Sequence, residues 1–242
     1  MKRAIRLVTI GTLAAAVLVG AASVAGASPG VTTCNGELAA GTYKRVVVPA
    51  DAVCLSNGPV TVRGGLYIEQ GATFVLGSEE NPVDTGTIYG GVHATDAMSV
   101  QIHFTTINGG IDVHGGSGPF GGPFDVTWNT IEDSSIHGNV TISGYNGFWM
   151  GFIRNDVHGS VNLTDNILVD EDGNEYVTNT IHGSLRCSGN SPAPQVGDSE
   201  GELNVVTGAK TGQCAGLLRH AERRARAPRE RVLAPSRLPA CE

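Results

Sequence analysis

A short phrase centred on glycine recurs along this chain and constrains its fold more than any other feature. Six copies align on Gly64, Gly90, Gly109, Gly138, Gly159 and Gly183, at spacings of 26, 19, 29, 21 and 24 residues. All eighteen positions two residues before, two after and four after these glycines are apolar, in a chain that is 40% hydrophobic. Apolar residues that alternate with polar ones have the period of a β-strand. Each copy therefore predicts a short strand, a glycine turn and a second short strand.

The variable length of the repeat indicates stacked coils with insertions at their corners. A period near two dozen residues excludes heptads and is typical of solenoids. The segments between the glycines are rich in β-branched residues and turn formers, with no helical stripe. The expected fold is an all-β solenoid of about six coils, each adding about 4.8 Å along the axis. It forms a single domain, residues 28–216.

The two ends of the chain differ in composition from this domain. Residues 1–27 have a basic start, an apolar run and a small-residue cleavage site, which is typical of a secretory signal peptide. No second apolar run is long enough to span a bilayer. Residues 28–216 hold six cations against 20 acids, a net charge of −14. This acidity argues against nucleic-acid binding, because phosphate contacts need clustered Lys and Arg.

The last segment, residues 217–242, is basic, with seven Arg and three Glu. We expect it to be a disordered tail. The alternative is that it docks on an anionic envelope polymer or on the acidic domain itself.

Cysteine placement fits an exported protein. Cys34 and Cys54 flank the first segment, and Cys187 and Cys214 flank the last. We predict the disulfides Cys34–Cys54 and Cys187–Cys214, although the spacing leaves other pairings open. They would close an N-terminal cap, residues 31–58, and a C-terminal return loop, residues 188–216. Cys241 is left over in the tail.

A resemblance refines the fold. The pattern N-x-I/V-H-G-S/N-V/L, present at 155–161 and 179–185, resembles the right-handed parallel β-helix of the pectate-lyase-like superfamily, whose coils often stack Asn at one corner. Asn155 and Asn179 match that ladder, and we expect Thr105 to replace Asn one coil earlier. The segments DGNEYVTNTIHGSLRCSGNSPAPQVGDS and VTGAKTGQC are similar to secreted bacterial β-helix proteins of unassigned function. The resemblance covers residues 31–214 and implies a fold, not an activity.

Three copies of the phrase carry His before the glycine. We expect His137, His158 and His182 to form an outward column at about 5 Å spacing, continued by Asn108, Tyr89 and Arg63, with Asp156 on the same face. Stacked imidazoles beside a carboxylate predict a zinc site or a proton-transfer site. The alternative is that a short polar residue before a turn glycine was simply duplicated with the coil.

Two further segments offer candidate binding sites. Gly-rich insertions hold the aromatic residues Phe120, Phe124, Trp128, Tyr145, Phe148 and Trp149. They predict a stacking platform for sugar rings, or else a cover over the solenoid. The acidic loop with Asp170, Asp172 and Glu175 suggests calcium ligands. It lacks EF-hand spacing, however, so a solvated turn is the alternative.

The catalytic motifs of the superfamily's galacturonan hydrolases, Gly-His-Gly and Arg-x-Lys, are missing from this sequence. Arg154, Asp156 and His158 are the residues closest to an acid–base set. We therefore expect a monomeric, secreted or cell-surface β-helix protein without catalytic activity, either a structural module or one that binds an extracellular polysaccharide or cell-envelope glycan. The alternative is a polysaccharide lyase or glycoside hydrolase.

Overall fold

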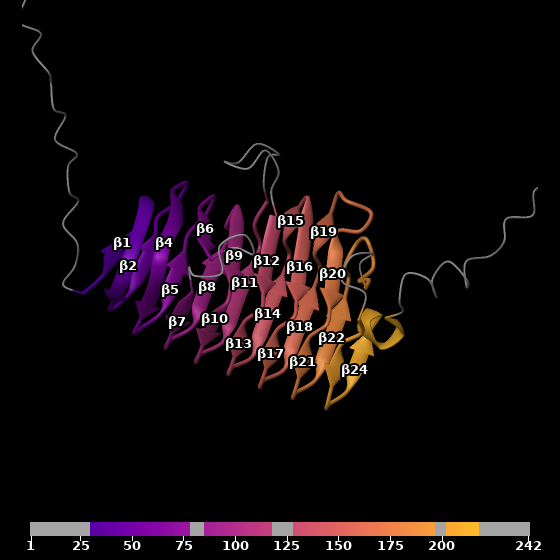
Figure 1. Cartoon of the computed structure of the whole chain (residues 1–242). Coiled ribbons are helices and arrows are strands. Elements are labelled where there is room, and N and C mark those ends of the chain that lie inside the picture. The colour runs from indigo at the N-terminus through magenta and orange to yellow at the C-terminus, as the bar shows by residue number, and fades with distance from the viewer. Residues whose placement is uncertain (1–29, 78–84, 118–127, 197–201, 218–242) are drawn as a thin grey trace, which may run out of the picture.

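The protein is a parallel β-solenoid, seen in a computed structural model that describes residues 30–77, 85–117, 128–196 and 202–217. The strands stack in chain order from one end of an elongated body to the other (Figure 1). Every strand pair is parallel, so each coil adds its strands onto those of the coil before. The all-β solenoid prediction is confirmed. The right-handed sense of the coil stays a prediction.

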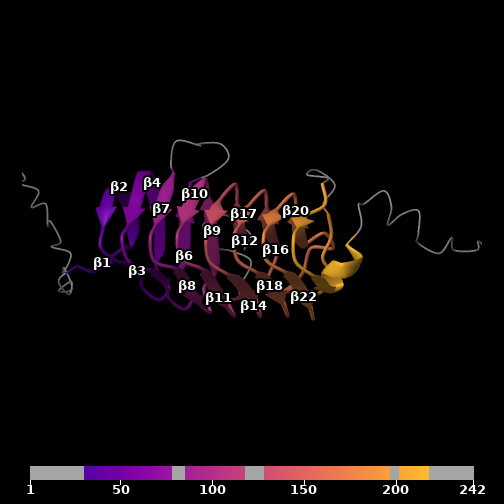
Figure 2. The same ribbon diagram turned by 90° about the horizontal axis from the view of Figure 1, so that it is seen from below.

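Three faces make up the stack, and we name them A, B and C. Face A is one sheet in the order β1 (Thr32–Thr33), β3 (Val46–Val48), β5 (Leu66–Ile68), β8 (Val92–Thr95), β11 (Ile111–His114), β14 (Val140–Ser143), β18 (Val161–Thr164), β22 (Leu185–Ser188) and β24 (Lys210–Gly212). Figure 2 shows β8, β11, β14, β18 and β22 as one row of this face.

Faces B and C share the long strand β4 (Val53–Val62), which runs along both. Strand β2 (Gly36–Tyr43) pairs with β4 along its length, so it also runs along both faces. Face B further contains β6 (Thr73–Leu76), β9 (Ser99–His103), β12 (Trp128–Glu132), β16 (Trp149–Ile153) and β20 (Asn174–Val177). Face C contains β7 (Gly86–Ile88), β10 (Thr105–Ile107), β13 (Ser135–Ile136), β17 (Asp156–Val157), β21 (Thr180–Ile181) and β23 (Val205–Val206). A short pair, β15 (Asn146–Gly147) and β19 (Ile167–Leu168), and a 3-10 turn, η1 (Gln213–Gly216), complete the described elements.

The core consists of the residues that the repeat predicted. All eighteen apolar positions around the six glycines are buried, each with at most 2% of its surface exposed. On face C, for example, Ile107, Ile136, Val157 and Ile181 lie one above another. Burial of like residues on like residues in successive coils is the main stabilising term of the stack.

The stack is longer than the six coils predicted. The six copies supply β5, β8, β11, β14, β18 and β22, whereas face A has nine strands among the described residues. Residues 31–58, expected to form a cap, contribute β1, β2, β3 and part of β4. Residues 188–216, expected to form a return loop, contribute β23 and β24. Both end segments therefore continue the sheets.

Both predicted disulfides are present. Cys34 bonds Cys54 and Cys187 bonds Cys214, with Cα–Cα distances of 5.5 and 5.2 Å. Disulfides persist in oxidising compartments, so these two indicate a protein that functions outside the reducing cytosol. Within the described residues, no helix is long and apolar enough to cross a membrane. The predicted signal peptide, the basic tail and Cys241 lie outside the described residues.

Two corners of the coil are built the same way, from a left-handed residue followed by a polar residue whose side-chain oxygen accepts from a backbone N–H of the coil before. At the corner between faces B and C, the left-handed residues Asp133, Arg154 and Thr178 precede Ser134, Asn155 and Asn179. The Asn ladder predicted from Asn155 and Asn179 is confirmed, and it continues to Asn204. Thr105 is two coils before Asn155, not one, because Ser134 occupies the coil between them.

A second ladder, which the sequence analysis missed, lies at the corner between faces A and B. Oδ1 of Asn166 accepts from the backbone N of Tyr145, Oδ1 of Asn190 accepts from Asn166, and Oε1 of Gln213 accepts from Asn190. Its signal in the sequence is a Gly or Asp followed directly by Asn or Gln, repeated at coil spacing.

Candidate functional site

The histidine column lies at the corner between faces C and A, where the turn glycines stack. The backbone N of His158 donates to Ile136 O, and that of His182 donates to Val157 O, both at 2.8 Å. The rings of His137 and His158 are stacked, with centroids 4.7 Å apart and planes at 29°, and the centroids of His158 and His182 are 5.1 Å apart. The predicted column and its spacing are thus present in the structure.

The same hydrogen-bond pattern carries the column in both directions. Asn108 N donates to Ile88 O and Tyr89 N to Val62 O, while Arg63 N donates to Tyr43 O, as predicted for the earlier coils. Thr207 N donates to Ile181 O, which adds a position beyond His182. Among the described residues, only the coils of His137, His158 and His182 place imidazoles side by side.

Asp156 connects two of these histidines. Its side chain points outward from β17, and its Oδ1 lies 3.0 Å from Nε2 of His182. Its Oδ2 lies 3.9 Å from Nε2 of His158. One ligating atom from each of the three residues lies within 4.8 Å of the other two. In the described part of the chain this is the one such group of three, so the group that converges contains Asp156 in place of His137.

Arg154 lies at another corner and turns toward other acids. It has a left-handed backbone, φ 53°, between β16 and β17. Its guanidinium donates through Nε and Nη2 to the two carboxylate oxygens of Asp133, both at 2.8 Å, and Nη2 is also 3.2 Å from Oε2 of Glu132. A bidentate Arg–carboxylate pair holds both side chains in a fixed orientation. The contacts of Arg154 thus lie toward face B, whereas His158 follows face C.

Glu132 brings a group of polar residues together that the sequence analysis missed. Its Oε1 accepts a hydrogen bond from Thr130 Oγ1, and its Oε2 lies 3.9 Å from Nδ1 of His103. Glu132 is 6% exposed and His103 is 8% exposed, although both point away from the core on face B. Alternation within a strand indicates only that such residues point outward, so no local signal marks this burial.

Part of face B is covered by a second apolar cluster. Ile153 and Val177 pack there with Val196, and Trp149, Leu203 and Leu217 lie against them. Val196, Leu203 and Leu217, which follow β22 in the chain, therefore lie against outward residues of β16 and β20. This packing gives Trp149 a structural role in addition to any binding role.

The predicted aromatic platform is present only in part. Trp128 and Trp149 are direct neighbours on β12 and β16, and both are half-buried, as is Phe148. Tyr145 is instead a core residue with 0% exposure, and its hydroxyl donates to Met98 O at 3.2 Å. It is not available to a sugar ring, because its side chain fills the corner between faces A and B. Phe120 and Phe124 lie outside the described residues.

The acidic loop forms a turn. Asp170 Oδ1 accepts from Asp172 N at 3.1 Å, and Gly173 N donates to Asp170 O at 2.9 Å. Glu175 belongs to β20 and is 7% exposed, whereas Asp172 is exposed. Asp170, Asp172 and Glu175 do not form a convergent group of ligands among the described residues. The turn arrangement accounts for the local hydrogen bonds without a cation.

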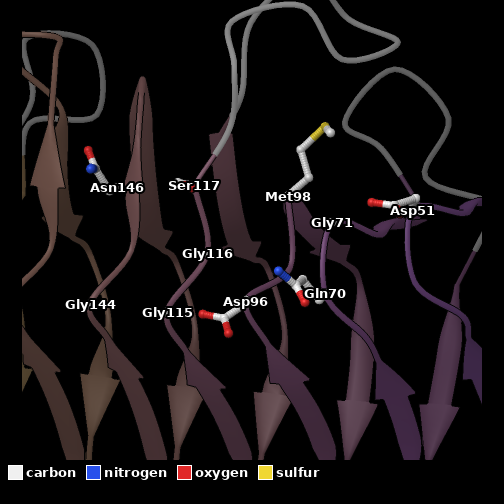
Figure 3. A pocket seen from close by; sticks show the side chains of 10 residues that line it. All are labelled: Asp51, Gln70, Gly71, Asp96, Met98, Gly115, Gly116, Ser117, Gly144 and Asn146. Atoms are coloured by element: carbon white, nitrogen blue, oxygen red, sulfur yellow. The ribbon is translucent and has the colours of Figure 1, made fainter.

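A groove runs along the corner between faces A and B, and we name it the corner groove. Its cavity volume is about 700 Å³, and Asp51, Gln70, Asp96, Met98, Ser117 and Asn146 line it together with four glycines. Figure 3 shows Asp51, Gly71, Asp96, Gly115 and Gly144 following one another along successive coils. All five have positive φ, between 60° and 71° except for Asp96 at 50°.

The floor of the corner groove needs glycine for a second reason besides backbone conformation. A methyl group on Gly71 would overlap Asp51 Oδ1, and one on Gly115 would overlap Asp96 Oδ1. Each carboxylate therefore lies over the glycine of the next coil, which leaves bare backbone between the polar side chains. The sequence signal is an Asp or Gly four residues after the second apolar position in five of the six repeats, as at Asp96, Gly115 and Gly144, whereas Gly71 comes one residue later in the first repeat.

These features define a class of protein, a disulfide-bonded parallel β-solenoid with polar side chains repeated along its corners. No match to this chain is found among known protein families, curated proteins or solved structures.

Proposed function

We propose that this protein is a secreted or surface-exposed, non-catalytic module that binds an extracellular or cell-envelope glycan in the corner groove. The observation that supports this is the repetition of exposed polar side chains, Asp51, Gln70, Asp96 and Asn146, above a glycine floor. Carboxylates accept hydrogen bonds from sugar hydroxyls, and side-chain amides both donate and accept. A polymer of similar units that lies along the axis meets similar groups coil after coil.

The spacing of the side chains suits an extended ligand. Asp51 and Asp96 are two coils apart, about 10 Å from the usual strand separation. The interval between them is lined by Gln70 and by the backbone of Gly71, so a sugar ring has room to approach. Several weak contacts to the same glycan polymer together raise its affinity, because each contact increases the effective concentration for the next.

Charge selects among glycans. Asp51 and Asp96 line the groove, none of its described lining residues is Lys or Arg, and the domain is strongly acidic. A polyuronate would be repelled by these carboxylates. The ligand we propose is therefore a neutral or amino-sugar polymer.

The test is retention of the mature protein on insoluble neutral, amino-sugar and acidic polysaccharides. We expect retention on a neutral or amino-sugar polymer, with at least a tenfold loss of affinity in Asp96→Gly combined with Asn146→Ala. Asp165→Gly is the matched control, because Asp165 has the same left-handed backbone and lies over Gly189 outside the groove. Glycine keeps the backbone conformation in both variants.

Three outcomes would count against the groove. No retention on any polymer would favour a purely structural module. Equal loss in Asp165→Gly would mean that the effect is on folding. Loss in Trp149→Ala with the groove variants unaffected would move the site to the paired tryptophans of face B.

The alternative function is a polysaccharide lyase or hydrolase acting around Asp156 and His158, with Arg154. The short distances from Asp156 to two imidazoles favour it, since a carboxylate beside histidine is a common acid–base pair. The pairing of Arg154 with Asp133 argues against a role for the guanidinium. Release of reducing ends from a polysaccharide panel, abolished by Asp156→Ala, would establish this alternative.

A further inference from the structure

We propose that Asp156, His158 and His182 form a binding site for a first-row divalent transition metal such as Zn²⁺. The site lies at the corner between faces C and A and is separate from the corner groove. It contains two imidazoles and one carboxylate whose ligating atoms all lie within 4.8 Å of one another. This proposal does not depend on the glycan-binding function.

The distances suit a shared ion after small side-chain rotations. Tetrahedral zinc with bonds of about 2.0–2.1 Å places its ligand atoms about 3.3 Å apart. The Asp156–His182 distance of 3.0 Å is slightly below this value, and the Asp156–His158 distance of 3.9 Å is slightly above it. The exposed fractions of the three side chains are 53% for Asp156, 53% for His158 and 51% for His182, so each can adjust without disturbing the core.

The backbone fixes which residues meet. Asp156 and His158 follow one another across the end of β17, and His182 occupies the equivalent position in the next coil. Parallel pairing of β17 with β21, Asp156 opposite Thr180 and Val157 opposite Ile181, holds that register. A metal held by these residues therefore links two adjacent coils.

The donor set identifies the class of ion. Imidazole nitrogen suits zinc, copper and nickel, whereas calcium takes oxygen ligands. One carboxylate cannot replace the several oxygens that calcium needs. Three protein ligands leave the fourth position of a tetrahedral ion open. Because all three side chains face solvent, water or a small ligand can reach that position.

The stacked ring of His137 distinguishes a metal site from a simple column of histidines. It packs against His158 at 4.7 Å and has similar exposure, but it is not part of the convergent group. If the imidazoles recur only because the coil was duplicated, substitution of His137 and of His182 should affect zinc binding equally. If the metal site is real, His182 is a ligand and His137 is not.

The experiment is a titration of the tag-free, EDTA-treated mature protein with zinc chloride. Calorimetry measures the binding, and thermal unfolding measures the melting temperature. We expect one equivalent to bind and the melting temperature to rise, because the metal binds the folded protein only. His158→Ala and His182→Ala should each weaken binding at least tenfold. His137→Ala should change it less than threefold.

Asp156→Asn keeps the shape of the side chain, so it tests the carboxylate even if an alanine variant folds poorly. His114→Ala is a further control, since His114 pairs with Asp112 at 2.8 Å on face A and belongs to no group of three. No saturable binding to the parent protein would overturn the proposal. So would equal weakening by His137→Ala, or unchanged binding in both His182→Ala and Asp156→Asn.

Discussion

Oδ1 of Asn179 accepts two hydrogen bonds from Asn155 one coil earlier, from the backbone N at 2.9 Å and from Nδ2 at 3.0 Å. Nδ2 of Asn179 donates to Phe152 O at 2.7 Å and to Oδ1 of Asn204. One buried amide thus satisfies backbone groups at a corner where no strand partner is present. Without such a partner, these buried backbone groups would destabilise the solenoid at each turn.

Asn179→Ala should destabilise the protein by about 2–4 kcal/mol, because it leaves the backbone N of Asn155 and the carbonyl of Phe152 buried without their partner. Urea unfolding measures the change. Asn139→Ala is the control. Asn139 is exposed, and its Oδ1 accepts from Ser160 N at 2.9 Å, so its loss should cost less than about 1 kcal/mol. Similar losses in the two variants would contradict the importance of burial.

Gly159→Ala should be strongly destabilising, by about 2 kcal/mol or more, because the added methyl would overlap the backbone O of Gly138 and lie 2.7 Å from the N of Asn139. Neighbouring backbone cannot move without breaking the stack. Gly216→Ala, where no atom lies within 4 Å of the added methyl, should change stability by less than about 0.5 kcal/mol. Thermal unfolding of both variants decides the matter, and a mild effect at Gly159 would mean that the coils can separate locally.

Replacing Cys34 and Cys54 with Ser should lower stability by about 3 kcal/mol, and the same change at Cys187 and Cys214 should cost a similar amount, since the bonds close sequence separations of 20 and 27 residues. The two pairs are at opposite ends of the stack. Their effects on urea unfolding should therefore add within about 0.5 kcal/mol. A strongly non-additive result would indicate that one end controls the stability of the other.

Alkaline pH should destabilise the protein through its buried tyrosines. Burial raises the pKa of Tyr145 and of Tyr176 well above the usual value, because the charged phenolate is poorly solvated in the core. The unfolded chain therefore loses these protons first. Stability is fully present below about pH 10 and falls above it, by up to about 1.4 kcal/mol per pH unit for each tyrosine.

Tyr145→Phe tests this effect, because it removes the titrating group while keeping the ring in the core. The pH dependence of urea unfolding above pH 10 should become shallower in this variant. Tyr89→Phe, at a residue that is 55% exposed, should leave the slope unchanged. If Tyr145→Phe also leaves the slope unchanged, the alkaline loss comes from other groups.

The repeat in the sequence was sufficient to predict the core and one corner. Apolar residues at fixed offsets from Gly138, Gly159 and Gly183 can be buried together only if the coils stack in register, so the inward residues and the histidine column followed directly. The disulfides were predicted from cysteines placed at the two ends of that repeat. Copies with weaker patterns were missed. Lys44 occupies the glycine position in an early coil. Gly208 is followed by exposed Lys210, on the last strand of face A in the described part of the chain.

Other features were decided only by the tertiary structure, because they depend on contacts between coils whose insertions differ in length. Tyr145 belongs to an aromatic-rich insertion, yet it turns into the core. Glu132 and His103 point away from the core, yet they are buried. Asp156 lies closer to His182 of the next coil than to His158 of its own. The sequence by itself determined which residues face inward and where the glycine turns lie. The stacking of one coil on the next determined which outward side chains meet, because that depends on the register between strands that are about two dozen residues apart.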